Sequence, residues 1–247
     1  MITHTVYEAI RNGVCGVGFL TEPLKVYMEN VDKPIFQVVG TGFLVEETLV
    51  LTNRHVIGAL MEARVTHVIP DTQFFIQFVV PGKSSNLQIV PRMIREVSYF
   101  DDPKLDLGFI KFKIVFTEHF VAIHRLKVAT AHSLQPTQPI GVCGYPYGTS
   151  ILVRGLYQRW GPVVQQGYIS AISPFDTTSQ PDEVLLDVRT AGGMSGAPVF
   201  LLEDGTVVAV HYAGIESTTA FGIPITQASI DRALSLYDKH KVVLVSE

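Results

Sequence analysis

The sequence has few cysteines and no concentration of basic charge. Its 247 residues include two cysteines, Cys15 and Cys143, and each lies in a glycine- and valine-rich stretch typical of a strand. We therefore expect buried free thiols and not a disulfide framework. The formal net charge is −4 and there is no run of lysine and arginine. Because a nucleic-acid backbone is bound through clustered basic charge, we expect no nucleic acid partner.

Long apolar segments are also missing. Nowhere does the sequence carry about 18 consecutive apolar residues, the length that a membrane-spanning helix needs. The N-terminus, MITHTVYEAIRNGVCGVGFL, has neither a basic region nor an unbroken apolar stretch of signal-peptide length. These absences predict no membrane partner and a cytoplasmic or otherwise intracellular location.

Motifs for metal ions and nucleotide cofactors are not found. There is no H-E-x-x-H, and His119 and His124 have the wrong spacing for one helical face. Gly13, Gly16 and Gly18 lack the order and the following helix of a dinucleotide-binding motif, and they fit a curved strand better. We expect no metal and no cofactor.

What the sequence does contain is a series of short strands. Hydrophobic residues make up 47% of the chain and charged residues 17%, enough for a sizeable core. Runs rich in Val, Ile and Phe, separated by Pro, Gly, Asn and Asp, predict strands on both sides of a polar linker at 130–139. The pattern predicts an all-β protein with an N-terminal barrel over 1–129 and a C-terminal barrel over 140–225.

Helices are scarce in this pattern. The segment 226–237 begins with a threonine suited to an N-cap and has one apolar face, so we predict a helix on the second barrel, within a C-terminal region of 226–247. Shorter helices are expected at 5–12 and just after His55. The tail at 241–245 can add a strand, although the sequence does not determine its neighbour.

Three polar residues stand next to predicted strands. The stretch GGMSGAPVF places Ser195 between glycines, which by itself is ordinary turn chemistry. A serine becomes a nucleophile only with a general base and a group that orients the base. His55 ends a buried apolar hairpin in LTNRHV, and Asp106 precedes a strand in LDLGFIKF; each also fits a purely structural role. Asp101 and Asp102, beside a proline, fit a solvated turn better.

These motifs resemble those of chymotrypsin-like serine proteases, in which His, Asp and Ser occur in this order. The resemblance covers about residues 35–235 and extends to HtrA-type protease domains through GYPYG at 144–148 and QGYISAI at 166–172. It implies two six-stranded β barrels of the chymotrypsin-like type, with His55 and Asp106 in the first barrel and the serine in the second.

The same resemblance implies a serine endopeptidase acting through an acyl-enzyme. Ser195 would be the nucleophile, His55 the general base and Asp106 the residue that orients it. The backbone N–H groups of Gly193 and Ser195 would form the oxyanion hole. Met194 stands where digestive-type members have aspartate, so activation by a new N-terminal amine is not expected.

The resemblance also places residues 208–214 along the primary specificity pocket. Glutamyl endopeptidases, and picornaviral proteases that cut after Gln, have a histidine at the position of His211, and the former have a threonine at the position of Thr190. Preference for Glu or Gln and preference for small or aliphatic residues both stay open, as does a purely structural His211. The candidate substrate-binding residues are Arg189, Thr190, His211, Tyr212, Ala213 and Gly214.

An extended peptide or protein segment is the expected partner, paired as an added strand with residues 212–214. The alternative function is a protease-like module that binds peptides with a latent or inactive triad. An esterase of the α/β-hydrolase type is disfavoured, because that fold places its histidine last and its serine before a helix. Gly155 and Gly161 flank aromatic residues in and after the insertion at 151–160, a pattern that predicts a movable flap, although the sequence does not determine whether it is an activation loop. The oligomeric state is not determined.

Overall fold

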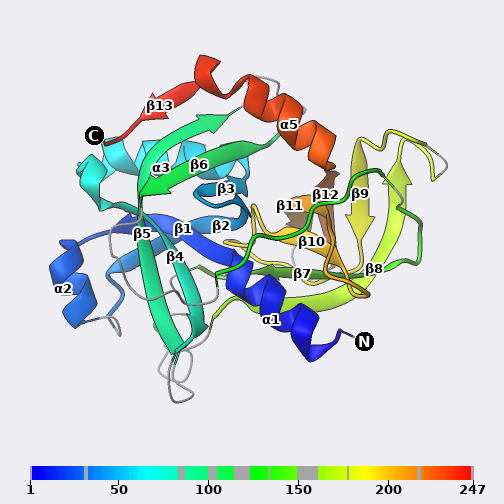
Figure 1. Cartoon of the computed structure of the whole chain (residues 1–247), viewed down its shortest axis with the longest axis horizontal. Helices are drawn as coiled ribbons and strands as arrows, with labels where there is room; N and C mark the ends of the chain where they lie inside the picture. Colours follow the sequence, from blue (N-terminus) through cyan, green and yellow to red (C-terminus); the bar gives the residue numbers. More distant parts are fainter. Residues whose placement is uncertain are drawn as a thin grey trace.

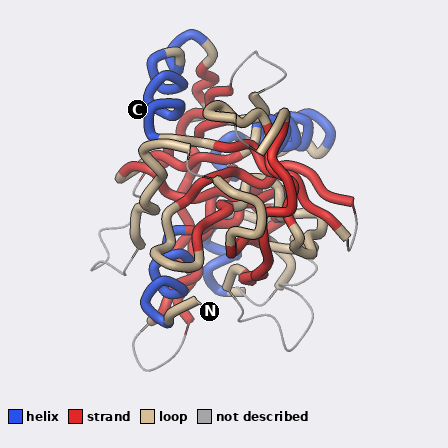
Figure 2. Tube along the Cα trace, turned by 90° about the vertical axis from the view of Figure 1, so that its right-hand side faces the viewer, coloured by secondary structure: helices blue, strands red, loops and turns tan. Residues whose placement is uncertain are grey.

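The computed structural model describes residues 2–30, 33–82, 87–99, 105–113, 123–132, 134–148, 161–176, 178–215 and 218–245. The predicted flap at 151–160 and the aspartates at 101–102 lie outside these ranges. Figure 1 shows two β barrels side by side, and Figure 2 shows the strands in the interior with the helices at the periphery. The predicted fold class is confirmed.

The first barrel is built from six antiparallel strands. They hydrogen-bond in the order β5-β4-β1-β2-β3-β6, and a β5–β6 pairing closes the ring. The strands are β1 (Val14–Leu20), β2 (Phe36–Glu46), β3 (Leu49–Thr52), β4 (Phe74–Pro81), β5 (Leu87–Tyr99) and β6 (Gly108–Lys113).

The second barrel is closed in the order β10-β11-β12-β9-β8-β7. Its strands are β7 (Pro139–Gly144), β8 (Val163–Ser173), β9 (Glu183–Leu186), β10 (Pro198–Leu201), β11 (Val207–Ile215) and β12 (Thr219–Pro224). The chain thus forms all six strands of the first barrel before it begins the second.

Both faces of the first strand are buried, which explains its unbroken apolar pattern. Every residue of β1 is buried. Cys15 and Val17 belong to the core of the first barrel, whereas Val14 belongs to a second cluster that also contains Phe200 and Val210 of the other barrel. Since side chains alternate along a strand, β1 contributes to the barrel interior and to the packing between barrels. Both cysteines are free and buried.

The helices are short and lie outside the barrels. They are α1 (His4–Gly13), α2 (Leu24–Glu29), α3 (Arg54–Thr66) and α5 (Gln227–Ser235), with 3₁₀ turns at Asp71–Gln73 and Tyr237–Lys239. The Thr226 hydroxyl caps α5, as predicted, but the α-helix ends two residues earlier than 237 and continues as a 3₁₀ turn. The helix α2 was not predicted. None of the described helices is long and apolar enough to cross a membrane.

The segments at the two ends of the chain each contact both barrels. Ile10 of α1 lies in one cluster with Val207 of the second barrel. At the other end, β13 (Lys241–Val243) leaves α5 and pairs antiparallel with β5 of the first barrel. The pairing with β5 identifies the neighbour of the C-terminal tail, which the sequence did not determine. Together with α1, the tail links the two barrels (Figure 1).

Candidate active site

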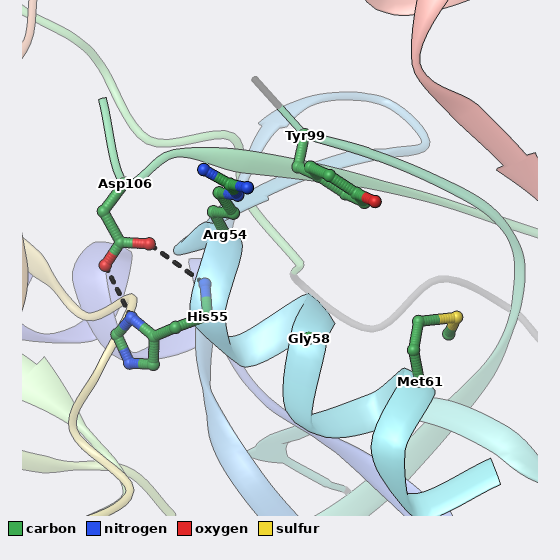
Figure 3. A pocket seen from close by; sticks show the side chains of 6 residues that line it. All are labelled: Arg54, His55, Gly58, Met61, Tyr99 and Asp106. Carbon is green, nitrogen blue, oxygen red and sulfur yellow. Dashed lines mark hydrogen bonds and ion pairs between the residues drawn. The ribbon is translucent and has the colours of Figure 1, made fainter. Parts of the chain in front are cut away.

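His55 and Asp106 lie side by side because of the register of two strands. β3 pairs with β6 so that Thr52 is opposite Gly108. The chain leaves β3 into the first turn of α3 at the same end where it enters β6, which brings His55 to Asp106. The His55 Nδ1 atom lies 2.5 Å from Asp106 Oδ2, and the His55 backbone N–H donates to Oδ1 at 3.0 Å (Figure 3).

This arrangement determines which imidazole nitrogen is free. A carboxylate can only accept a hydrogen bond, so Nδ1 carries the proton and Nε2 of a neutral ring has its lone pair available. The side-chain amide of Asn53 donates to the backbone carbonyl of Asp106 at 2.8 Å, which helps to fix the position of Asp106. The ring is therefore held in the tautomer that a general base needs.

A cavity of about 440 Å³ adjoins the His55–Asp106 pair. Arg54, Gly58 and Met61 line it from one face of α3, and the Arg54 guanidinium lies over the Tyr99 ring at 5.5 Å. Its lining residues are Arg54, His55, Gly58, Met61, Tyr99 and Asp106 (Figure 3).

Ser195 comes from the turn before β10 in the second barrel. Its carbonyl accepts the Thr41 N–H of β2 at 2.8 Å, and an ideal Cβ on Gly40 would lie 2.6 Å from the Val56 side chain and 3.2 Å from the Ser195 carbonyl oxygen. Since Val56 follows His55, the segment that carries the imidazole and the serine turn both pack against Gly40. The Ser195 hydroxyl donates to the Tyr212 carbonyl at 3.4 Å. In the part of the chain that the structure describes, Ser195 has no hydrogen bond to His55.

Two backbone donors are available beside the serine. Gly193 has a φ of +93°, and any Cβ there would come within 2.3 Å of the Tyr145 carbonyl oxygen, so only glycine fits. Its own carbonyl accepts the Thr41 hydroxyl at 2.7 Å. Across the described ranges, neither the Gly193 N–H nor the Ser195 N–H has an acceptor. These free amides can bind an oxygen that gains negative charge.

His211 is buried next to this turn. The residue is 3% exposed, and neither ring nitrogen makes a hydrogen bond of standard geometry among the described residues. The Met194 backbone interacts with the ring and partly opposes the effect of burial on its pKa. Its backbone N–H donates to the Ala197 carbonyl and its carbonyl accepts the Gly196 N–H, both at 2.9 Å, which holds the strand against the serine turn. Burial lowers the pKa of His211 to about 4, so the ring is neutral at pH 7.

Two other predicted substrate-binding residues lie close to each other. An ideal Cβ on Gly214 would lie 2.5 Å from Thr190 Oγ1, so these two residues face each other closely. β10 pairs with β11 only as far as Val210. On the side of β11 that faces β10, residues 212–214 therefore have no neighbouring strand among the described residues. Arg189, in contrast, is exposed at the surface, and the structure shows no contact between it and His211.

A comparison with protein families identifies the family of this chain. Residues 40–210 match the family described as trypsin-like peptidase domain. The chain belongs to this family. The match spans both barrels and contains all three residues His55, Asp106 and Ser195. No curated protein matches the sequence of this peptidase domain.

Solved structures share the fold of the peptidase domain at low sequence identity. The inactive form of a serine-to-alanine mutant of Rv3671c from M. tuberculosis H37Rv is 17% identical, with a TM-score of 0.55 over 96% of this chain and 92% of that chain. Deg5 is also 17% identical, with a TM-score of 0.57 over 94% of this chain and 90% of that chain. At this identity the likeness shows the fold alone.

Several residues of the peptidase domain that support the site were not identified from the sequence. Thr41 donates to the Gly193 carbonyl and accepts the Tyr145 N–H at 3.1 Å, so one hydroxyl links the two barrels. Asn53 also contacts Asp106, and Tyr147 also contacts Gly192. Their local patterns are those of any strand threonine, helix cap or turn, and no sequence signal distinguishes them. Within the described ranges, no three His, Cys, Asp or Glu side chains are placed to hold a metal ion.

Proposed function

We propose that the protein is a serine endopeptidase, with Ser195 as nucleophile, His55 as general base and Asp106 as the residue that orients the base. The observation that carries the proposal is the hydrogen bond from His55 Nδ1 to Asp106, because it leaves Nε2 free next to the serine turn. The trypsin-like peptidase family supports the reaction class. The substrate is a protein or peptide in extended form.

The first half of the reaction forms an acyl-enzyme. The Ser195 hydroxyl turns from the Tyr212 carbonyl toward His55, gives its proton to Nε2, and its oxygen attacks the peptide carbonyl carbon. The carbonyl oxygen becomes an oxyanion that accepts the N–H groups of Gly193 and Ser195. The imidazolium then gives its proton to the amide nitrogen, the C–N bond breaks, and the amine leaves.

The second half repeats these roles with water. His55 removes a proton from water, the resulting hydroxide attacks the ester carbonyl, and the proton returns to Ser195 as the acid product leaves. Asp106 stabilises the imidazolium in both halves and stays ionised. In other serine proteases, the loss of one oxyanion donor lowers kcat roughly 100- to 1,000-fold, so the two free amides account for a large part of the catalysis.

Labelling with a fluorophosphonate probe tests the proposal. We expect the wild-type protein to be labelled at Ser195 and to cleave a casein or peptide-library substrate, and we expect Ser195→Ala to do neither. Equal melting temperatures for the two proteins would show that the substitution leaves the fold intact. Cleavage retained by Ser195→Ala would assign the activity to another residue and contradict the proposal.

A second candidate function has one observation in its favour. The Ser195 hydroxyl is bonded to Tyr212 and not to His55, as a latent or inactive triad would have it. In that case residues 212–214 bind an extended peptide as an added strand and nothing is cut. Peptide binding to the wild-type protein, with neither labelling nor cleavage under any condition, would favour this function over the endopeptidase.

We also propose that the primary specificity pocket takes glutamine or glutamate, held by His211 and Thr190. The neutral imidazole supports the amide over the carboxylate, because a buried carboxylate without a positive partner costs several kcal/mol. A neutral ring has one N–H to donate to a side-chain carbonyl and one nitrogen to accept from an amide. Exposed Arg189 has no assigned contact in this pocket.

Peptides that differ only in the residue before the cut test the pocket. We expect kcat/KM to be highest for Gln, lower for Glu and lowest for Leu at pH 7. The variant His211→Leu should lower kcat/KM for Gln about 10-fold or more, since a buried amide then lacks its partner, and should leave cleavage after Leu unchanged or improved. Wild-type preference for Leu or Ala would assign a small or aliphatic pocket instead.

A further inference from the structure

The turn after β7 has an unusual backbone. Tyr147 has a φ of +59° and Gly148 a φ of +50°, so two consecutive residues are left-handed. The conformation suits glycine, but for tyrosine it is unfavourable, because the Cβ atom crowds the backbone. The Tyr147 side chain is 60% exposed, so burial of the ring does not offset this cost. Strain of this kind persists only where the surroundings hold it.

The surroundings that hold the turn are the residues before the serine. The Tyr147 N–H donates to the Gly192 carbonyl at 2.6 Å, and the Gly148 N–H closes the turn on the Tyr145 carbonyl at 3.0 Å. A Cβ on Gly193 would lie 2.3 Å from the Tyr145 carbonyl oxygen and 2.8 Å from the Gly148 nitrogen. The turn therefore packs directly behind the peptide that joins the two glycines.

The geometry of a trans peptide connects this contact to the oxyanion hole. In a planar trans peptide the C=O and the N–H point in opposite directions. When the Gly192 carbonyl points at Tyr147, the Gly193 N–H must point the other way, and there it has no acceptor among the described residues. Because glycine stands on both sides, the peptide would otherwise rotate with little steric resistance.

We infer that the Tyr147 backbone N–H is a positioning group that holds the Gly192–Gly193 peptide with its N–H toward the oxyanion. The inference rests on the proposed endopeptidase function. The left-handed turn is the conformation that brings this donor to Gly192. Without the bond, the peptide turns over, its carbonyl enters the hole, and one of the two oxyanion donors is lost.

Three replacements at Tyr147 separate the ring, the backbone conformation and the donor. Tyr147→Gly removes the ring but keeps the N–H and favours positive φ. Tyr147→Val keeps the N–H but disfavours positive φ, because it is β-branched. Replacement of the tyrosine by its α-hydroxy acid exchanges the amide for an ester, which deletes only the donor.

We expect Tyr147→Gly, which keeps the donor, to lower kcat much less than the other two variants do. The valine and ester variants should lower kcat about 10- to 1,000-fold, the range for a partly or fully lost oxyanion donor, with little change in KM. KM stays because His211, Thr190 and residues 212–214 are untouched. Melting temperatures check that each variant is folded. Wild-type kcat in both the valine and the ester variants would overturn the inference.

Crystal structures of the wild-type protein and the ester variant test the inference independently of activity. We expect the Gly192 carbonyl to point at Tyr147 in the wild type and to be turned over in the ester variant. An unchanged peptide in the ester variant would overturn the inference. A wild-type protein that neither labels nor cleaves would contradict the proposed function, while the crystal structures would still decide whether Tyr147 controls the peptide.

Discussion

At the scale of single residues, the site depends on groups whose partners come from distant parts of the sequence. Asp106 contacts both the ring and the backbone N–H of His55, so it sets the position and the tautomer of the base together. Thr41 performs a similar task for the other half of the site, because its hydroxyl joins Gly193 to Tyr145. In both cases the geometry of the hydrogen bonds positions the groups of the site.

Replacing the Asp106 carboxylate by an amide tests its role as the group that orients His55. In Asp106→Asn the side-chain NH₂ can face Nδ1, which moves the ring proton to Nε2 and removes the base. We expect kcat for peptide cleavage to fall roughly 10³- to 10⁴-fold at pH 7. Steady-state kinetics measure the loss, and unchanged KM and melting temperature are the controls. An asparagine variant with near-normal kcat would exclude Asp106 as the orienting residue.

At the scale of elements, β13 and the turn before it attach the C-terminal segment to the first barrel. The Tyr237 carbonyl accepts the Ser98 hydroxyl at 2.9 Å, and the Lys111 ammonium lies 4.1 Å from the centre of the Tyr237 ring. Beyond β13, Leu244 is 6% exposed and its N–H donates to the Arg95 carbonyl at 2.8 Å. The segment therefore buries apolar surface in the core of the first barrel.

Shortening the buried side chain of this segment should lower the stability of the protein. We expect Leu244→Ala to lower the free energy of unfolding by about 3 kcal/mol, the usual size for a buried leucine. Val243→Ala is the matched control, because Val243 is 52% exposed and should change the free energy little. Urea unfolding measures both variants. An equal loss in the two would show that Leu244 does not anchor the segment.

At the scale of the whole molecule, the buried His211 makes stability depend on pH. Its pKa is lowered from 6.5 to about 4 in the folded protein, so between these values the unfolded chain binds more protons than the folded protein. Stability is therefore fully present above about pH 6.5 and is lost as the pH falls toward 4. His132, whose burial also lowers its pKa, acts in the same direction.

A variant without this imidazole isolates its contribution. We expect the wild-type protein to lose about 3 kcal/mol more stability than His211→Leu between pH 7 and pH 4, as two and a half pKa units imply. Urea unfolding at pH 7, 6, 5 and 4 gives both curves, and the difference cancels His132. Parallel curves would show that His211 is not buried as a neutral ring.

Local patterns in the sequence were enough to predict the strands, one helix and the family. Alternating apolar residues and turn signals predicted strands on both sides of residues 130–139, and the N-cap threonine predicted α5. The motifs around His55, Asp106 and Ser195 predicted the family. These predictions succeed because side-chain alternation, capping and turn preferences act over a few residues, and because motif residues keep their order along the chain.

How these segments meet depends on contacts that form only in the folded protein. The pairing of β3 with β6 brings His55 to Asp106, and the packing between barrels places Thr41 against the serine turn. Within the second barrel, the turn after β7 brings Tyr147 to Gly192. The tertiary structure also exposes Arg189, buries His211 and sends β13 to β5. Strand register, burial and barrel packing are set by contacts between residues far apart in sequence, so no local pattern contains them.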